Sequence, residues 1–183
     1  MERNRILKYG NLLAWAVFWL LVVAMAVLTA GLIVWLINPE SFSSVRMVDP
    51  AGAGFGTGTF KTGSADGIAL SELTSGMIFW IYFRGIFFAG IGLLIARKVL
   101  AVLSSIKQLK TFYSGNIEHF RDMARIGFIA FLFSCVNVGY IDGVINVNFT
   151  LAIWPLTFSV ACLVLSEVFR EGKHLLEENE MIV

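Results

Sequence analysis

The sequence predicts an all-α, polytopic membrane protein with four transmembrane helices and both termini in the cytoplasm. Of its 183 residues, 57% are hydrophobic and only 15% are charged, whereas a water-soluble domain carries about 25% charged residues. No charged residue stands between Leu12 and Ile37, and about 20 apolar residues suffice to cross the hydrocarbon layer of a bilayer. Three further apolar stretches follow, so residues 1–183 are predicted to form a single four-helix membrane domain.

The four predicted spans follow one another with connections of very different length. They cover, in order, residues 12–36, 75–98, 126–145 and 150–169. Only a short turn containing Gly143, Asn146 and Asn148 is expected between the last two spans. We therefore expect the third and fourth helices to form an antiparallel hairpin.

Lysine and arginine residues set the predicted orientation. Eleven of them lie before the first span, after the fourth, or from Arg97 and Lys98 at the end of the second span up to the third, against Arg46 and Lys61 in the remaining connections. Because Lys and Arg in short loops stay in the cytoplasm, both termini and the connection 98–125 are predicted to be cytoplasmic. The glycine-rich loop 38–72 is then extracytoplasmic, and the protein lies in the bacterial cytoplasmic (inner) membrane with the lipid bilayer as its main partner.

The connection 98–125 is predicted to continue the second helix. Apolar residues recur at intervals of three and four over 99–112, so this helix is expected to reach about Tyr113. Ser114-Gly115 then breaks it, and Asn116 is expected to cap a new helix that runs into the third span. A basic amphipathic segment of this kind either lies on an anionic lipid surface or serves as a protein-docking face.

Arg84 is the one full charge placed well inside a predicted span. It lies about eight residues from the outer boundary, which is roughly 12 Å at 1.5 Å per residue. An intramembrane arginine is costly and is by default a candidate functional residue, although its long side chain can also reach the headgroups. A third alternative is an ion pair with Asp142, near the outer end of the third span. We predict that the Arg84–Asp142 pair fixes how the two helical hairpins pack.

The extracytoplasmic side carries two further features. Alternating glycines in residues 51–67 do not form a phosphate-binding loop, because no Gly-Lys-Ser/Thr follows and no strand-to-helix transition is expected. A flexible loop or a small irregular hairpin is expected instead. Polar residues near the outer ends of the last two spans either join helices by hydrogen bonds or line a small outward-facing cavity: these are Ser134, Asn137, Tyr140, Asn146 and Asn148.

The sequence contains no residue set that predicts catalysis. Cys135 and Cys162 are far apart in the chain, and neither His119 nor His174 has a metal-ligand partner or nucleophile at useful spacing. Paired buried carboxylates and a Ser-His-Asp set are also missing. We therefore predict no enzymatic activity, no cofactor and no metal site. With a net charge of +1, direct nucleic-acid binding is not expected either.

The C-terminal tail, residues 170–183, is the predicted docking element. Its acidic residues precede an apolar end, which suits a short docking peptide and equally an ordinary helix end. The candidate docking residues are Glu177, Glu178, Glu180, Met181, Ile182 and Val183.

The chain resembles a known family over approximately residues 72–183. The end of the fourth helix has the order Phe-x-x-Gly-x-x-Leu-x-x-Glu-x-Glu, formed by Phe169, Gly172, Leu175, Glu178 and Glu180 and followed by the apolar end. The connection adds Asn116, Arg121 or Arg125, and Gly127. These stretches resemble the DUF2975-like family of small four-helix bacterial membrane proteins of unknown function, although the Phe and Pro of that family's connection are absent here. Many members are encoded beside a short regulator, so the resemblance implies a small cytoplasmic helix-turn-helix regulator as partner.

Two functions follow as hypotheses. The first is a non-enzymatic interaction, sensing or regulatory protein that acts through its cytoplasmic connection and tail. The alternative is a small transporter or channel subunit with a polar path near Arg84 and Asp142. Four helices seldom enclose a pore alone, so the alternative requires an oligomer.

Overall fold

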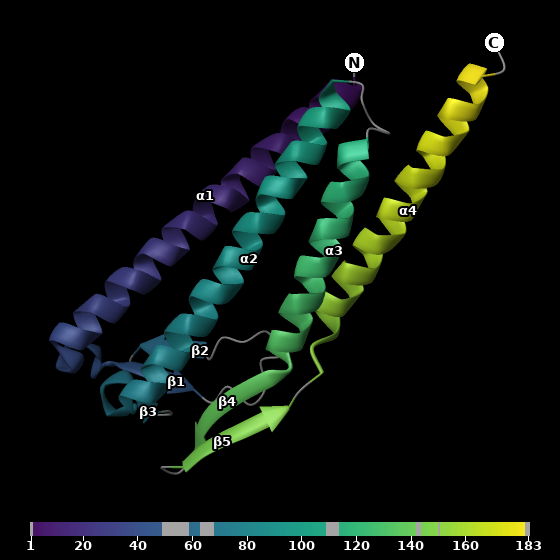
Figure 1. Cartoon of the computed structure of the whole chain (residues 1–183). Helices are drawn as coiled ribbons and strands as arrows, with labels where there is room; N and C mark the ends of the chain where they lie inside the picture. Colours follow the sequence, from purple (N-terminus) through teal and green to yellow (C-terminus); the bar gives the residue numbers. More distant parts are fainter. Residues whose placement is uncertain are drawn as a thin grey trace. The chain divides into compact units, whose positions relative to one another are not determined.

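Four helices account for most of the described chain (Figure 1). The computed structural model describes residues 2–48, 59–62, 68–108, 114–141, 144–149 and 151–181. Within these ranges the helices are α1 (Glu2–Ile37), α2 (Ser75–Lys107), α3 (Ser114–Ser134) and α4 (Ile153–Met181). The prediction of a helical protein with four helices is therefore confirmed.

Three of these helices are long and apolar enough to cross a membrane. Among the described residues the candidate spans are Leu7–Ile37, Ser75–Lys107 and Ile153–Glu178. They support a multi-pass membrane protein. The helix α3 has 21 residues, or about 31 Å at 1.5 Å per residue, but its first half carries charged residues and it is not one of the three.

The predicted third span, residues 126–145, is wrong in its second half. The helix α3 ends at Ser134, and the chain then forms the antiparallel strands β4 (Val136–Ile141) and β5 (Val144–Phe149). β-branched residues alternate there with asparagine or glycine, which is the period of a strand rather than a helix. In addition, Asp142-Gly143 separates the paired residues Ile141 and Val144, and Asp-Gly is a preferred two-residue hairpin connection.

A second, three-stranded sheet lies between α1 and α2 in the sequence. After the short helix η1 (Pro39–Phe42), the strands are β1 (Val45–Val48), β2 (Thr59–Thr62) and β3 (Ile68–Ala69), and the short helix η3 (Leu70–Glu72) follows. All neighbours are antiparallel in the order β2-β1-β3. Of the glycine-rich residues 51–67, for which a flexible loop or hairpin is predicted, only Thr59–Thr62 are described, and they pair with β1.

The connection between α2 and α3 differs from its prediction at one position. The helix α2 ends at Lys107, and the expected end at Tyr113 lies outside the described residues. The helix α3 already begins at Ser114, so the prediction that Asn116 caps it is wrong. Asn116 is instead the third helical residue, with 1% of its surface exposed. As predicted, α3 continues without a break into its apolar half.

The described chain forms two compact units. Unit 1 comprises residues 1–21, 91–131 and 153–183, and unit 2 comprises residues 22–90 and 132–152. In unit 1, Ser159 Oγ donates a hydrogen bond to the carbonyl oxygen of Ala124 at 2.7 Å, and Ser166 Oγ donates to that of Ile117 at 3.2 Å. These contacts run in opposite directions along the two helices, which confirms the predicted antiparallel packing of α3 and α4.

The core of unit 2 is built around the C-terminal end of α1 and the N-terminal end of α2. Trp35, Leu73, Met77 and Ile78 are buried together. The indole Nε1 of Trp35 donates to the carbonyl oxygen of Leu70 at 3.3 Å. This contact ties the end of α1 to the residues that lead into α2.

Candidate functional site

Arg84 is buried in unit 2, with 6% of its surface exposed. Its Nη1 donates to the carbonyl oxygen of Val136 at 3.1 Å, and its Nη2 donates to Oδ1 of Asn137 at 2.7 Å. Its Nε has no acceptor among the described residues. The guanidinium therefore joins the middle of α2 to the first two residues of β4, and among the three predicted alternatives this favours a structural role.

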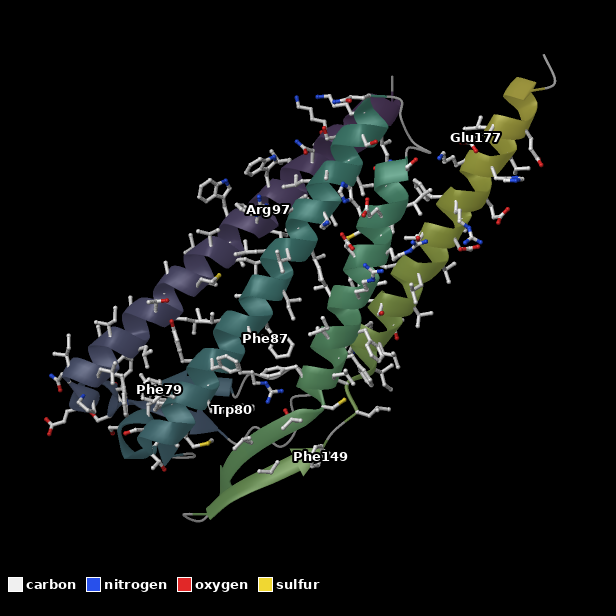
Figure 2. The ribbon with its side chains drawn as sticks, in the orientation of Figure 1. Phe79, Trp80, Phe87, Arg97, Phe149 and Glu177 are labelled. Atoms are coloured by element: carbon white, nitrogen blue, oxygen red, sulfur yellow. The ribbon has the colours of Figure 1, made fainter. Side chains whose placement is uncertain are left out.

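Aromatic side chains share the α2 face that carries Arg84. Phe133, near the end of α3, has ring contacts with four residues spaced three and four apart on α2, with centroid distances from 4.1 to 5.9 Å. The Arg84 guanidinium carbon also lies 5.8 Å from the ring centroid of Phe88, within reach of a cation–π contact. The four α2 residues are Trp80, Phe83, Phe87 and Phe88; Figure 2 labels Trp80 and Phe87.

The predicted partner of Arg84, Asp142, lies outside the described residues. Ile141, the last described residue before it, is five residues beyond Val136 along an extended strand. At about 3.3 Å per residue this is roughly 16 Å from the carbonyl that Arg84 contacts. The Arg84–Asp142 pair stays a prediction, and the contacts that the structure shows for Arg84 are those to Val136 and Asn137.

The other polar residues predicted near this end fall into two groups. Ser134 is buried at the end of α3, and Asn137 accepts the bond from Arg84. Tyr140 belongs to β4, and Asn146 and Asn148 belong to β5, but their side chains lie outside the described part. The bond from Arg84 to Asn137 is a polar contact of the predicted kind, but it joins α2 to the strand β4 rather than to another helix.

The predicted docking tail is the last part of α4. Glu177 and Glu178 are exposed and lie on one continuous helix with the preceding apolar span, as Figure 2 shows for Glu177. Glu180 and Met181 belong to the same helix, although their side chains are not described, and Ile182 and Val183 lie outside the described residues.

Two leucines add to this exposed helix end. Leu175 and Leu176 expose 58% and 48% of their surfaces. Two residues before Leu175, Lys173 Nζ donates to Ser114 Oγ at 3.0 Å and joins α4 to the start of α3. Sequence reasoning missed this face because it read Leu175 only as part of the family pattern.

The connection contributes a charged cluster in unit 1. Lys98 Nζ donates to Asp122 Oδ2 at 2.6 Å, and Arg125 Nη1 lies 3.5 Å from Oδ1 of the same carboxylate. The hydrogen bond from Lys98 lowers the pKa of Asp122 below its ordinary value of 3.8, and the nearby positive charges of Lys98 and Arg125 lower it further. The cluster joins α2 to α3 as a structural contact.

Within the described residues, no group of three His, Cys, Asp or Glu side chains is placed to hold a metal ion. Both cysteines are free thiols, and Cys162 is buried against Met123 and Ala124 in the core of unit 1. No protein-family model matches the chain, and neither curated proteins nor solved structures show a significant match to it. The resemblance to the small four-helix family therefore stays a prediction.

Proposed function

We propose that this chain is a non-enzymatic membrane protein that docks a cytoplasmic partner through the end of α4 and the adjoining connection. The observation that carries this proposal is the exposed pair Leu175 and Leu176, which lies beyond the predicted span 150–169 and within the last four residues of the candidate span Ile153–Glu178. Burying a leucine side chain is worth about 1.5–3 kcal/mol. A partner that covers both leucines therefore gains a substantial part of its binding free energy from them.

The charge of the same segment indicates the chemistry of the partner. Residues 167–180 contain five glutamates but only one arginine and one lysine. Arg170 is paired with Glu167, and Lys173 with Glu177, along the helix itself, so neither cation is free to attract an acidic surface. The remaining negative charge favours a basic partner, since complementary potentials steer association.

A small cytoplasmic helix-turn-helix regulator, which the family resemblance implies, has this chemistry. Its DNA-binding face has to be basic, because phosphate contacts supply much of its affinity for DNA. An acidic helix at the membrane surface would compete with DNA for that face. The membrane protein would then regulate transcription without itself binding nucleic acid.

The connection belongs to the same docking region. The contact between Lys173 and Ser114 places the start of α3, which lies within the connection 98–125, beside the start of the exposed α4 segment. Both elements lie in unit 1, so a partner bound to the end of α4 would also meet the connection.

The transport alternative has less support. The guanidinium of Arg84 is hydrogen-bonded inside unit 2, on a face that also carries four aromatic rings. Such surroundings favour a fixed inter-element contact over a hydrated path. Liposome flux of ions and small solutes tests the alternative directly, and flux that disappears in Arg84→Leu would replace the docking proposal.

Affinity purification from native membranes tests the docking proposal. We expect the full-length chain to retain a small basic helix-turn-helix protein, identified by mass spectrometry. The double variant Leu175→Ser/Leu176→Ser and a chain lacking Glu177–Val183 should both lose it. Leu36→Ser is the matched control and should retain the helix-turn-helix protein. Leu36 is about as exposed as the two leucines but lies at the C-terminal end of α1. Equal recovery by all four chains would refute docking through α4.

A further inference from the structure

Unit 2 contains an apolar pocket that the proposed docking function does not use. Its volume is about 260 Å³. The pocket lies between the outer half of α1 and the first turns of α2, and the segment between them contributes its remaining wall. Its lining includes Leu28, Gly31 and Trp35 from α1, Ile78 and Tyr82 from α2, and Phe42 from η1.

The shape of the pocket follows α1. The α1 residues in its lining extend from Val27 to Trp35, which is about 12 Å along a helix with a rise of 1.5 Å per residue. Because α1 is a candidate membrane span, this row of lining residues follows the direction of that helix. Acyl chains of a bilayer lie along the same direction.

The chemistry of the lining is almost entirely hydrocarbon. Its polar side-chain groups are the indole N–H of Trp35, which donates to the carbonyl oxygen of Leu70, and the phenol of Tyr82. The Tyr82 hydroxyl lies 3.5 Å from Oγ1 of Thr29, which in turn donates to the carbonyl oxygen of Met25 at 2.8 Å. Apolar cavities of about 150 Å³ already bind benzene in water-soluble proteins. The pocket is larger and offers an occupant little beyond apolar contact.

Gly31 gives the pocket part of its width. Nothing lies within 4 Å of the point where a Cβ would stand on this residue. Glycine in a helix interior lowers helix stability by about 0.5–1 kcal/mol relative to alanine. Replacing Gly31 by leucine therefore should not destabilise α1, because the added side chain meets no atom at its Cβ and the helix loses a glycine. The leucine side chain would take up pocket volume instead.

We propose that this pocket binds one acyl chain of a membrane phospholipid. The apolar lining, its position beside a candidate membrane span and the space beside Gly31 together fit an alkyl chain that enters from the surrounding bilayer. The site is independent of docking through α4, because its lining lies wholly within residues 27–82. Failure of one proposal therefore leaves the other untouched.

Fluorescence quenching of Trp35 tests the proposal, because this indole lines the pocket and exposes only 8% of its surface. The full-length chain keeps Trp35, and its other four tryptophans are replaced by phenylalanine. It is reconstituted in vesicles of phosphatidylcholine brominated along the acyl chains. We expect Trp35 to lose more than half of its emission relative to vesicles of the unbrominated lipid.

Blocking the pocket should remove this quenching. Gly31→Leu should restore most of the Trp35 emission, Gly31→Ala should restore a smaller part, and Gly76→Leu, at an exposed position with open space, should restore none. A chain that keeps only Trp19, 59% exposed on α1, reports on bulk lipid and should be quenched equally with and without Gly31→Leu. Circular dichroism checks that each variant keeps its helix content.

Three results would overturn the proposal. The first is Trp35 quenching that is absent or unchanged across the Gly31 series. The second is quenching by a brominated fatty acid in detergent without quenching by the phospholipid, because the occupant would then not come from a bilayer lipid. The third is loss of quenching in Tyr82→Phe, which would show that a polar group on the ligand, rather than its alkyl chain, is recognised.

Discussion

The two units hold their helices together by different means. In unit 1, α3 and α4 approach closely through small residues, with Gly127, Ala124 and Ser159 at the contact. In unit 2, large rings and the buried Arg84 join α2 to α3 and β4, Gly85 lies close to Leu28 of α1, and a pocket of about 260 Å³ remains beside α1. The described contact of α3 with α4 is thus made by small residues, whereas bulky side chains predominate around α2 in unit 2.

Because of this difference, we expect the two units to have different roles. Small residues and interhelical serine bonds are typical of stable helix association in lipid, so unit 1 is expected to be the rigid support for the exposed end of α4. Unit 2 combines an apolar pocket with a fixed arginine, and it is expected to tolerate changes in the pocket lining. Substitutions in the two units sharpen or break this comparison.

The largest effect is expected at Gly127. A Cβ on this residue would lie 3.0 Å from Cδ1 of Phe158 and 3.4 Å from the backbone Cα of Ser159, so Gly127→Leu forces α3 and α4 apart. Overpacking of this kind costs about 1–3 kcal/mol. Unfolding in mixed micelles with rising SDS measures this loss. The control Gly76→Leu, where no atom lies within 4 Å of the added Cβ, should leave stability almost unchanged; equal losses would contradict the tight contact.

The next effect is expected at Arg84. Arg84→Leu leaves the carbonyl of Val136 and the amide of Asn137 without their donor, and a buried unsatisfied polar group costs about 1–3 kcal/mol. Arg84→Lys should lose less, because one ammonium can still reach one acceptor. The same unfolding assay measures both losses.

Double-mutant cycles then decide which partner matters. Arg84→Ala combined with Asn137→Ala should be non-additive by about 1 kcal/mol. Arg84→Ala combined with Asp142→Ala tests the predicted ion pair. If the Arg84/Asn137 losses are additive and the Arg84/Asp142 losses are not, then Asp142 rather than Asn137 is the partner of Arg84.

A smaller effect is expected at the serine bonds of unit 1. Ser159→Ala removes the bond to the carbonyl of Ala124, and interhelical hydrogen bonds in membranes average about 0.6 kcal/mol. Thr157→Ala is the matched control, because Oγ1 of Thr157 is exposed and bonds only to Ile153 on its own helix. If both variants lose the same stability, the interhelical bond contributes nothing.

The smallest effect is expected from pH at Asp122. The pKa of its carboxyl is lowered in the folded protein by Lys98, so the folded state binds the proton less readily than the unfolded chain does. The stabilisation is complete above the ordinary value of 3.8 and is lost as pH falls through the lower folded pKa. In Asp122→Asn this part of the acid-induced loss should disappear. If stability falls with pH in the same way in both proteins, the Lys98–Asp122 ion pair does not contribute to stability.

The sequence predicted the helices far better than it predicted the residues around Arg84. Uncharged length identifies α1, and overall apolar length identifies α2 despite Arg84, because the bilayer sets the required number of apolar residues. The residues after Ser134 were misread because they continue the apolar composition of a span. Their alternation of valine or isoleucine with asparagine or glycine, closed by Asp142-Gly143, was the signal for a hairpin.

The surroundings of Arg84 could be predicted only in part, because the strand β4 was interpreted as part of a helical span. Arg84 stood out as the lone intramembrane charge, but its contact with Asn137 depends on where β4 begins. The pocket could not be predicted, because it is formed by residues as distant in sequence as Val27 and Tyr82. The exposure of Leu175 and Leu176 likewise depends on where the contacts of α4 with its neighbours end.

Cysteine labelling in intact cells tests most directly whether the end of α4 and the connection face the cytoplasm. Cys135 and Cys162 are first replaced by alanine, and a single cysteine is then placed at Glu40, Lys107 or Lys173. A membrane-impermeant maleimide should label the cysteine at position 40 in intact cells, and those at 107 and 173 only after permeabilisation. Labelling of position 107 or 173 in intact cells would contradict the account, because no cytoplasmic partner could then reach the proposed docking region.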